Sequence, residues 1–266
     1  MSSLSVLIPT KNSYPEIERC LKSVKPIADE IIILDSYSSD QTVEECQDYG
    51  CKVIQQEFED FSDLRERLLQ EASNEWVLFI DSDEEVTTEL QESILSAIKN
   101  ASVGAYELKR RDRMFDHWMI GFDSNHLRLG RKTDISITSD IVHEEVEYLG
   151  EGSPIVLDGY LNHHTYSSIS EYLDKFDQYT SLEALKHERE GSHPSIFLFI
   201  LKGIVVSCKY GIVNKAILNG YAGLLFIAFS FMYRIVTYGK IKEIQEYKRQ
   251  NPDDWESQWI KKRCSR

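Results

Sequence analysis

The feature that most constrains the fold is the alternation of short apolar runs with amphipathic segments over the first hundred residues. The runs 4–8 and 30–34 are rich in β-branched residues, which is typical of parallel strands covered on both faces. Between them, Ile17, Leu21 and Val24 recur at spacings of three and four, which predicts a helix with one apolar stripe. Strand, helix and strand in this order predict a βαβ unit.

The same alternation continues to about residue 100. Helix, strand, helix and strand are predicted in turn over residues 40–50, 52–55, 62–72 and 76–80. A further helix is indicated by Thr88 and Gln91, which have the spacing of a capping box. We therefore predict an α/β fold with a mostly parallel, Rossmann-like sheet flanked by helices. In such a sheet the ligand site lies at the carboxyl ends of the strands.

Beyond residue 103 the periodicity weakens. Strands are expected over 104–110 and 155–157, separated by a polar, loop-rich stretch, and the chain is predicted to be helical from Ser168 onward. This pattern predicts an α/β domain over residues 1–165 and a helical carboxyl-terminal extension over residues 166–266.

Charge and cysteine content narrow the function classes. The formal net charge is −14, which disfavours a nucleic-acid binder, yet residues 186–266 hold 14 Lys or Arg against 7 Asp or Glu. The five cysteines are scattered without a CxxC spacing, which argues against a zinc site and for a reducing compartment. The first apolar run is too short for a secretory signal and lacks a basic segment before it. We expect an intracellular protein.

Polar residues follow three of the predicted strands at the point where each strand ends. They are Pro9-Thr10-Lys11-Asn12, then Asp35-Ser36 with Asp40, and then Asp81-Ser82-Asp83. Because the carboxyl ends of parallel strands meet at one edge of a sheet, we expect these loops to form one crevice. Two carboxylates one residue apart can face a hard cation that also binds phosphate, although an acidic turn capping the next helix has the same sequence.

These motifs, in this order and spacing, resemble the three nucleotide-binding motifs of family 2 glycosyltransferases, which have the GT-A fold. The resemblance covers about the first 90 residues. A weaker resemblance runs through Val142-His143-Glu144 and the carboxyl-terminal helices. It points to the lipopolysaccharide-core β-1,4-glucosyltransferase group and its relatives in envelope polysaccharide synthesis.

The resemblance implies a role for each motif residue. The residues implied to surround the nucleotide sugar are Pro9, Thr10, Lys11, Asn12, Asp35, Ser36, Asp40, Asp81, Ser82 and Arg128. Asp83 is implied to bind Mg²⁺ or Mn²⁺ bridging the diphosphate, with Asp81 supporting the ribose or the metal. Such a metal neutralises the charge that develops on the departing UDP.

The family reaction is inverting, so one carboxylate removes the proton of the attacking hydroxyl. Glu144 is the first candidate for this base, with His143 orienting it or touching the diphosphate. Asp123 and Asp140 are the alternatives, and a charged strand with an incidental histidine remains an open interpretation of residues 142–144.

Together these features predict a transferase that moves a hexose, glucose from UDP-glucose, to a hydroxyl of a lipopolysaccharide-core or other cell-envelope glycan. Two other classes stay open. One is a nucleotidyltransferase, although the basic, Gly-rich phosphate loop usual in that class is absent. The other is a non-catalytic sugar-nucleotide-binding protein of the same fold.

The carboxyl-terminal region holds an uncharged stretch over residues 216–233, which is just long enough to cross a bilayer. The favoured alternatives are a buried helix or a helix lying in the membrane interface. The cations expected near lipid headgroups are Lys202, Lys209, Lys215, Arg234, Lys240 and Lys242. We therefore expect a cytoplasmic protein that is peripheral on the inner membrane, with a glycolipid or polysaccharide acceptor and no nucleic-acid partner.

Overall fold

The computed structural model describes residues 3–57, 61–138, 146–192, 195–251, 254–256 and 259. The chain forms two compact units, which we call the sheet unit and the helical unit. The sheet unit comprises Met1–Asp112 and Asp123–Thr165, and the helical unit comprises Arg113–Phe122 and Tyr166–Arg266. The functional division at residue 165 stays a prediction.

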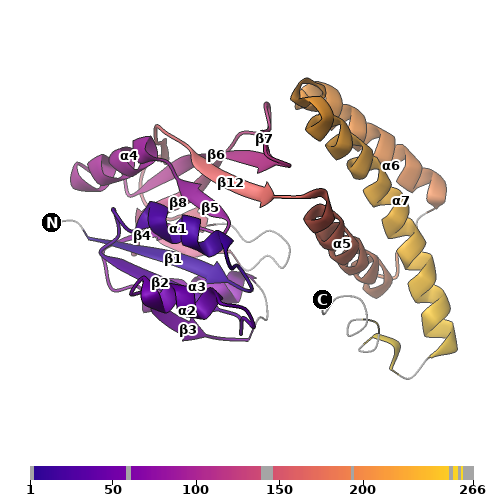
Figure 1. Cartoon of the computed structure of the whole chain (residues 1–266), viewed down its shortest axis with the longest axis horizontal. Helices are drawn as coiled ribbons and strands as arrows, with labels where there is room; N and C mark the ends of the chain where they lie inside the picture. Colours follow the sequence, from indigo (N-terminus) through magenta and orange to yellow (C-terminus); the bar gives the residue numbers. More distant parts are fainter. Residues whose placement is uncertain are drawn as a thin grey trace. The chain divides into compact units, whose positions relative to one another are not determined.

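Four parallel strands form one half of the main sheet, in the order β3-β2-β1-β4 (Figure 1). Their bounds are β1 Leu4–Thr10, β2 Glu30–Asp35, β3 Lys52–Gln55 and β4 Trp76–Phe79. The helices of this half are α1 Glu16–Val24, α2 Thr42–Asp48, α3 Phe61–Glu71 and α4 Thr88–Lys99. This order brings the ends of β1, β2 and β4 to one edge.

The other half of the sheet is mixed and continues in the order β8-β6-β12-β5, with β8 antiparallel to β4. Its strands are β5 Glu84–Val86, β6 Ala105–Met114, β7 His117–Trp118, β8 Ser124–Arg131, β11 Ile155–Val156 and β12 Leu161–Tyr166. Strands β9 Ile135–Ile137 and β10 Val146–Tyr148 form a separate pair. The predicted α/β class, with its helical carboxyl-terminal region, is confirmed.

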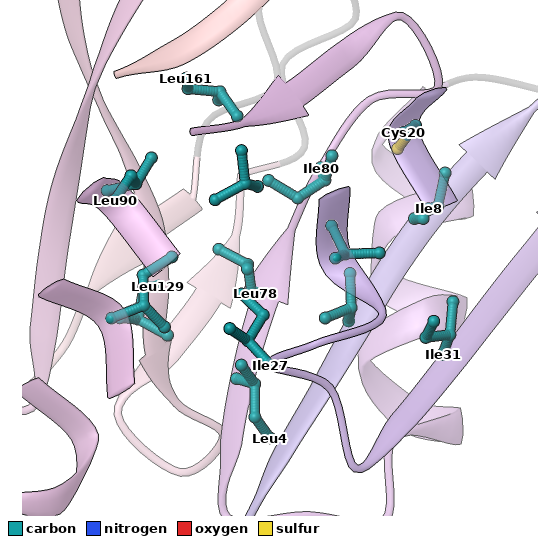
Figure 2. Close-up of a cluster of buried hydrophobic side chains, with 14 of the residues drawn as sticks. Leu4, Ile8, Cys20, Ile27, Ile31, Leu78, Ile80, Leu90, Leu129 and Leu161 are labelled. Carbon is teal, nitrogen blue, oxygen red and sulfur yellow. The ribbon is translucent and has the colours of Figure 1, made fainter. Parts of the chain in front are cut away.

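Strands β1, β2 and β4 are buried on both faces, whereas the edge strand β3 is partly exposed. Successive side chains of a strand point to opposite faces. On β4, Leu78 packs in the cluster beneath α1 and α4, whereas Val77 and Phe79 pack in the cluster beneath α3. Figure 2 shows the first cluster, in which Leu4, Leu78 and Leu129 come from neighbouring strands. This two-sided burial explains why the strands are continuous apolar runs.

The helical unit contains α5 Ile169–Arg189, α6 Ile196–Cys208 and α7 Gly220–Gln250. Between α6 and α7 lie a π-helical turn, Lys209–Val213, and a 3₁₀ turn, Ala216–Asn219. Helices α5 and α7 run in the same direction: Tyr172 stacks on Phe229, and Lys240 bonds to Thr180 further along both helices. Helix α6 runs in the opposite direction along α7.

Two predictions about local structure were wrong in detail. The described part of the stretch 111–154 is not dominated by loops, because β7, β8, β9 and β10 lie in it. Polar residues interrupt the apolar alternation of these strands. The N-cap of α4 is Thr87 instead of Thr88, since the Thr87 hydroxyl accepts from the Leu90 amide. The side chain of Gln91 bonds to the Ser23 carbonyl instead of closing a capping box.

The close approach of the chain to the start of α4 supplies a stability prediction. Gly159 has φ +90°, and a Cβ there would lie 2.4 Å from the Leu90 backbone nitrogen. Gly152 has φ +87° and open space around it, so it is a matched control. We expect Gly152→Ala to lower the free energy of unfolding by about 1 kcal/mol through backbone strain alone. Gly159→Ala should lower it by about 3 kcal/mol, because the clash with rigid backbone adds to that strain.

Urea denaturation of the two variants checks this comparison. Equal losses of unfolding free energy would contradict the close approach of Gly159 to α4.

Candidate functional site

Hydrogen bonds join the three polar loops at the carboxyl edge of the parallel strands. The Ser13 hydroxyl bonds to the hydroxyls of Thr10 and Ser82, each at 2.9 Å, and so links the loops after β1 and β4. Asn12 links the loops after β1 and β2. Its backbone amide donates to Ser38 Oγ, and its side-chain oxygen accepts from the backbone amide of Ser39, both at 2.8 Å. The structure thus brings the three motifs together.

At this edge of the sheet the predicted nucleotide residues differ in accessibility. Lys11, Asn12 and Asp40 are exposed, and Pro9 and Ser82 are half-buried. Thr10, Asp35 and Ser36 are buried. The Asp35 carboxylate accepts hydrogen bonds from the Ser38 amide and from Gln55, so it holds the shape of its own loop.

The loop after β4 is organised by two arginines. Asp81 receives Arg65 Nη2 at 3.1 Å and Arg128 Nη2 at 2.9 Å, and Arg128 also reaches Glu84 at 3.3 Å. Glu84 is 0% exposed and accepts a hydrogen bond from the Asp81 amide. Arg128, on β8, is 5% exposed, so its guanidinium is almost wholly buried.

These contacts separate the protonation behaviour of the two carboxyls. Burial disfavours the charged form of Asp81, but the positive charges of Arg128 and Arg65 outweigh it and hold its pKa well below the usual range. For Glu84 burial prevails over the attraction of Arg128, and the nearby Asp81 charge adds to it, so its pKa is raised. Asp81 is therefore the firmly ionised member of the pair.

The second acid of the motif, Asp83, faces a histidine. Asp83 Oδ2 lies 3.4 Å from His163 Nε2, and His163 Nδ1 lies 2.8 Å from Asp112 Oδ1. Burial lowers the pKa of His163, but its hydrogen bonds with Asp112 and Asp83 outweigh this and raise it to about 10. About a third of the Asp83 side chain is exposed, so its carboxylate can also meet a ligand.

The predicted base, Glu144, lies outside the described residues, as do His143 and Asp140. The alternative base, Asp123, is exposed just before β8. Its role and that of Glu144 stay predictions.

Three contributors to this site were not selected from the sequence. Arg65 lies on α3, Asp112 on β6 and His163 on β12, so they are distant in the chain from the loop that they hold. Tyr37, in the loop after β2, is exposed and has a left-handed backbone at φ 56°. A non-glycine residue in that conformation is a structural signal of a constrained site. The sequence signal for His163 was only a histidine pair within a polar strand.

Comparison with known proteins assigns the class of this site. The model of glycosyl transferase family 2 matches residues 5–144, more than half of the chain, and the chain belongs to this family. An uncharacterized glycosyltransferase of Rickettsia typhi is 28% identical over 260 residues, covering 92% of this chain and 88% of that protein. One from Rickettsia prowazekii is 28% identical over 263 residues, with the same coverage. The family favours a glycosyltransferase over a nucleotidyltransferase.

Solved structures give a more distant likeness. Residues 1–349 of TarS from S. aureus match with 15% identity and a TM-score of 0.41, covering 93% of this chain and 91% of that one. Glucosyl-3-phosphoglycerate synthase from Mycobacterium tuberculosis, solved with Mn²⁺, UDP and phosphoglyceric acid, matches with 25% identity and a TM-score of 0.36. This match covers 42% of this chain and 44% of the synthase chain. At these values the likeness carries no argument on substrates.

The arginine between Asp81 and Glu84 supplies a second stability prediction. Arg128→Met leaves the buried Glu84 without its cation, and we expect a loss of roughly 3–5 kcal/mol in unfolding free energy. Arg131, three residues further along the same strand, pairs with Glu75 at 3.1 Å on the surface. Arg131→Met should cost under about 1 kcal/mol, since exposed pairs contribute little. Chemical denaturation measures both, and a smaller loss for Arg128→Met than for Arg131→Met would refute the assigned role.

Proposed function

We propose that this protein is an inverting glycosyltransferase that transfers glucose from UDP-glucose to a hydroxyl of a lipopolysaccharide-core or other cell-envelope glycan. The observation that carries the proposal is the convergence of the three motif loops at one edge, with Asp83 beside them. Residues Lys11, Asn12 and Asp40 are accessible there to a nucleotide. The buried members of the motifs, Asp35 among them, hold the loops in place.

The donor set beside Asp83 suits a divalent metal held partly by substrate. Among the described residues no group of three or more histidine, cysteine or acidic side chains could hold a metal by itself. Mg²⁺ typically takes only one or two carboxylates and completes its shell with water and substrate phosphates. We propose that Asp83, with Asp81 in support, holds Mg²⁺ or Mn²⁺ together with the donor diphosphate, while the protonated His163 orients the Asp83 carboxylate. The bound metal would neutralise charge on the departing UDP.

In this proposal the remaining residues position the reacting groups. Arg65 and Arg128 hold the Asp81 carboxylate ionised and fixed, so Asp81 is available to the ribose or to the metal. Arg128 then acts through Asp81 instead of touching the diphosphate, as its burial favours. Glu144 removes the proton of the acceptor hydroxyl, with His143 beside it in sequence and Asp123 or Asp140 as alternatives. The protein is placed on the cytoplasmic face of the inner membrane, where a lipid-linked acceptor is anchored.

Binding of nucleotide diphosphates tests the donor and metal assignments together. We expect calorimetry to detect UDP binding in Mn²⁺, weaker binding in EDTA, and weaker binding of GDP, CDP and ADP. Asp83→Asn should remove the Mn²⁺-dependent part, because it deletes a charged ligand while keeping the side chain's shape. Asp158→Asn is the matched control. The Asp158 side chain is highly exposed and forms a long ion pair, 3.8 Å, with Lys109. Unchanged Mn²⁺ dependence in Asp83→Asn would refute the metal assignment.

The base is tested by separating binding from transfer. Glu144→Gln should bind UDP as the wild type does but transfer sugar at least about a hundredfold more slowly, since general-base catalysis is worth that much. Glu145→Gln is the control for the adjacent acid. An unchanged rate for Glu144→Gln, with a loss in Asp123→Asn or Asp140→Asn, would move the base to that residue. Release of UDP distinguishes glycosyl transfer from nucleotidyl transfer, which releases pyrophosphate.

A further inference from the structure

Helix α6 exposes a broad apolar face. Phe197 is 72% exposed, and Leu201, Ile204, Val205 and Cys208 are also exposed. In a helix of 100° per residue these positions fall on one side. The face continues into the turn, and we call the whole surface the apolar strip: Phe197, Leu198, Leu201, Ile204, Val205, Cys208, Ile212, Val213, Ile217 and Leu218. A contiguous apolar surface of this kind marks an interaction site.

By length and composition two segments could cross a membrane. They are Ile196–Val213, of mean hydropathy 2.0, and Ala216–Gln250, in which an 18-residue window has a mean hydropathy of 1.6. If both crossed, the turn between them would lie on the far side of the bilayer from the sheet unit. Contacts within the helical unit decide whether that can happen.

The turn is hydrogen-bonded to the short segment 115–122. Asn219 bonds to both backbone groups of Ile120, accepting from its amide at 2.7 Å and donating to its carbonyl at 3.1 Å. Asn214 donates to the Gly121 carbonyl at 3.2 Å. Residue 115 follows directly on β6, whose first eight residues belong to the sheet unit. The segment between the sheet-unit part of β6 and Ile120 is too short to cross a bilayer, so the turn stays on the side of the sheet unit.

Helix α5 also opposes a spanning arrangement of α7. Lys240 on α7 is buried, and its ammonium donates to Asp177, Thr180 and Ser181 of α5. Arg234 likewise pairs with Glu183 at 2.7 Å. The buried Lys240 therefore does not face lipid, contrary to expectation. A spanning α7 would take with it the exposed charges of α5, which bilayer hydrocarbon disfavours.

The charge around the apolar strip identifies its partner. Residues 195–242 contain six Lys or Arg and no Asp or Glu. Lys202 and Lys209 are exposed, and their seven-residue spacing places them together on one edge of the strip. In a spanning helix Lys202 would lie near the middle of the hydrocarbon, whereas in a helix parallel to the membrane both lysines reach the headgroups.

We propose that the apolar strip lies in the plane of an anionic lipid bilayer, with α6 and the turn inserted to interfacial depth and neither helix crossing it. Lys202 and Lys209 bind the phosphate headgroups along one edge. This inference rests on the proposed peripheral placement of the enzyme. Binding to vesicles needs neither donor nor acceptor, so it can fail or hold independently of the sugar-transfer reaction.

Vesicle binding of the full chain tests the partner. We expect co-sedimentation with vesicles of phosphatidylcholine and phosphatidylglycerol, weaker binding to phosphatidylcholine alone, and weakening by salt. Lys202→Glu with Lys209→Glu should reduce affinity by at least about thirtyfold. Each cation lost near an anionic surface weakens binding by about fivefold, and the two new carboxylates also repel the lipid. Lys22→Glu with Lys99→Glu, on α1 and α4, carries the same change in net charge and should bind as the wild type does.

The apolar contribution has its own matched pair. Leu201 on the strip is 46% exposed and Leu95 on α4 is 43% exposed. Leu201→Ser should weaken vesicle binding by about tenfold or more, and Leu95→Ser should leave it unchanged. If the strip instead closes a dimer, Leu201→Ser would shift the sedimentation of the free protein and the lysine reversal would leave vesicle binding intact. That result would overturn the proposal.

Sidedness separates an in-plane strip from a spanning hairpin. Lys215→Cys places a thiol in the turn, and Lys99→Cys places one in the sheet unit. Spheroplasts are treated with a membrane-impermeant maleimide, and peptide mass spectrometry identifies the labelled cysteine. We expect both introduced cysteines to react only after the spheroplasts are lysed. Labelling of Lys215→Cys in intact spheroplasts, with Lys99→Cys protected, would show a spanning hairpin and refute the in-plane arrangement.

Discussion

The site depends on one buried guanidinium, that of Arg128. Four acidic residues follow within the six positions after β4, and two of them, Asp81 and Glu84, pair with Arg128. Without a cation between them, the buried Glu84 and the neighbouring Asp81 would resist ionising together. Strand β8 supplies that cation by pairing antiparallel to β4, with Leu129 opposite Leu78. The mixed half of the sheet is thus the means by which a later part of the chain reaches the motif loop.

The parallel half could be predicted because its determinants are local. Continuous apolar runs such as Ile31–Leu34 indicate strands buried on both faces, and the period of Ile17, Leu21 and Val24 indicates the helix between them. The order of the strands then follows from the short right-handed connections that such units use. Of the strands after residue 104, those predicted over 104–110 and 155–157 correspond to β6 and β11. Strands β8 and β12 escaped prediction because polar and charged residues interrupt their apolar alternation.

The candidate site could be predicted only in part, for the same reason. Its loops were recognised because each lies directly after a local strand signal. The partners of those loops were not, because Arg65, Asp112 and His163 come from three other elements and are brought in by tertiary packing. Motif membership also does not distinguish a residue that meets a ligand from one that supports its loop. Asp35 illustrates the second case: its oxygens are bonded to Ser38 and Gln55 and it is fully buried.

For α6 and α7 as well, the sequence composition does not determine what role the surrounding structure gives the segment. Their hydropathy is that of membrane spans, and composition alone cannot separate a span from an interfacial helix. Two asparagines in the turn, Asn214 and Asn219, make the difference, because their side chains bond to the backbone of 120–121. A turn tied to the end of a sheet strand cannot be on the opposite side of a bilayer from that sheet. In the proposed in-plane arrangement, these two asparagines of the turn therefore determine how the apolar helices meet lipid.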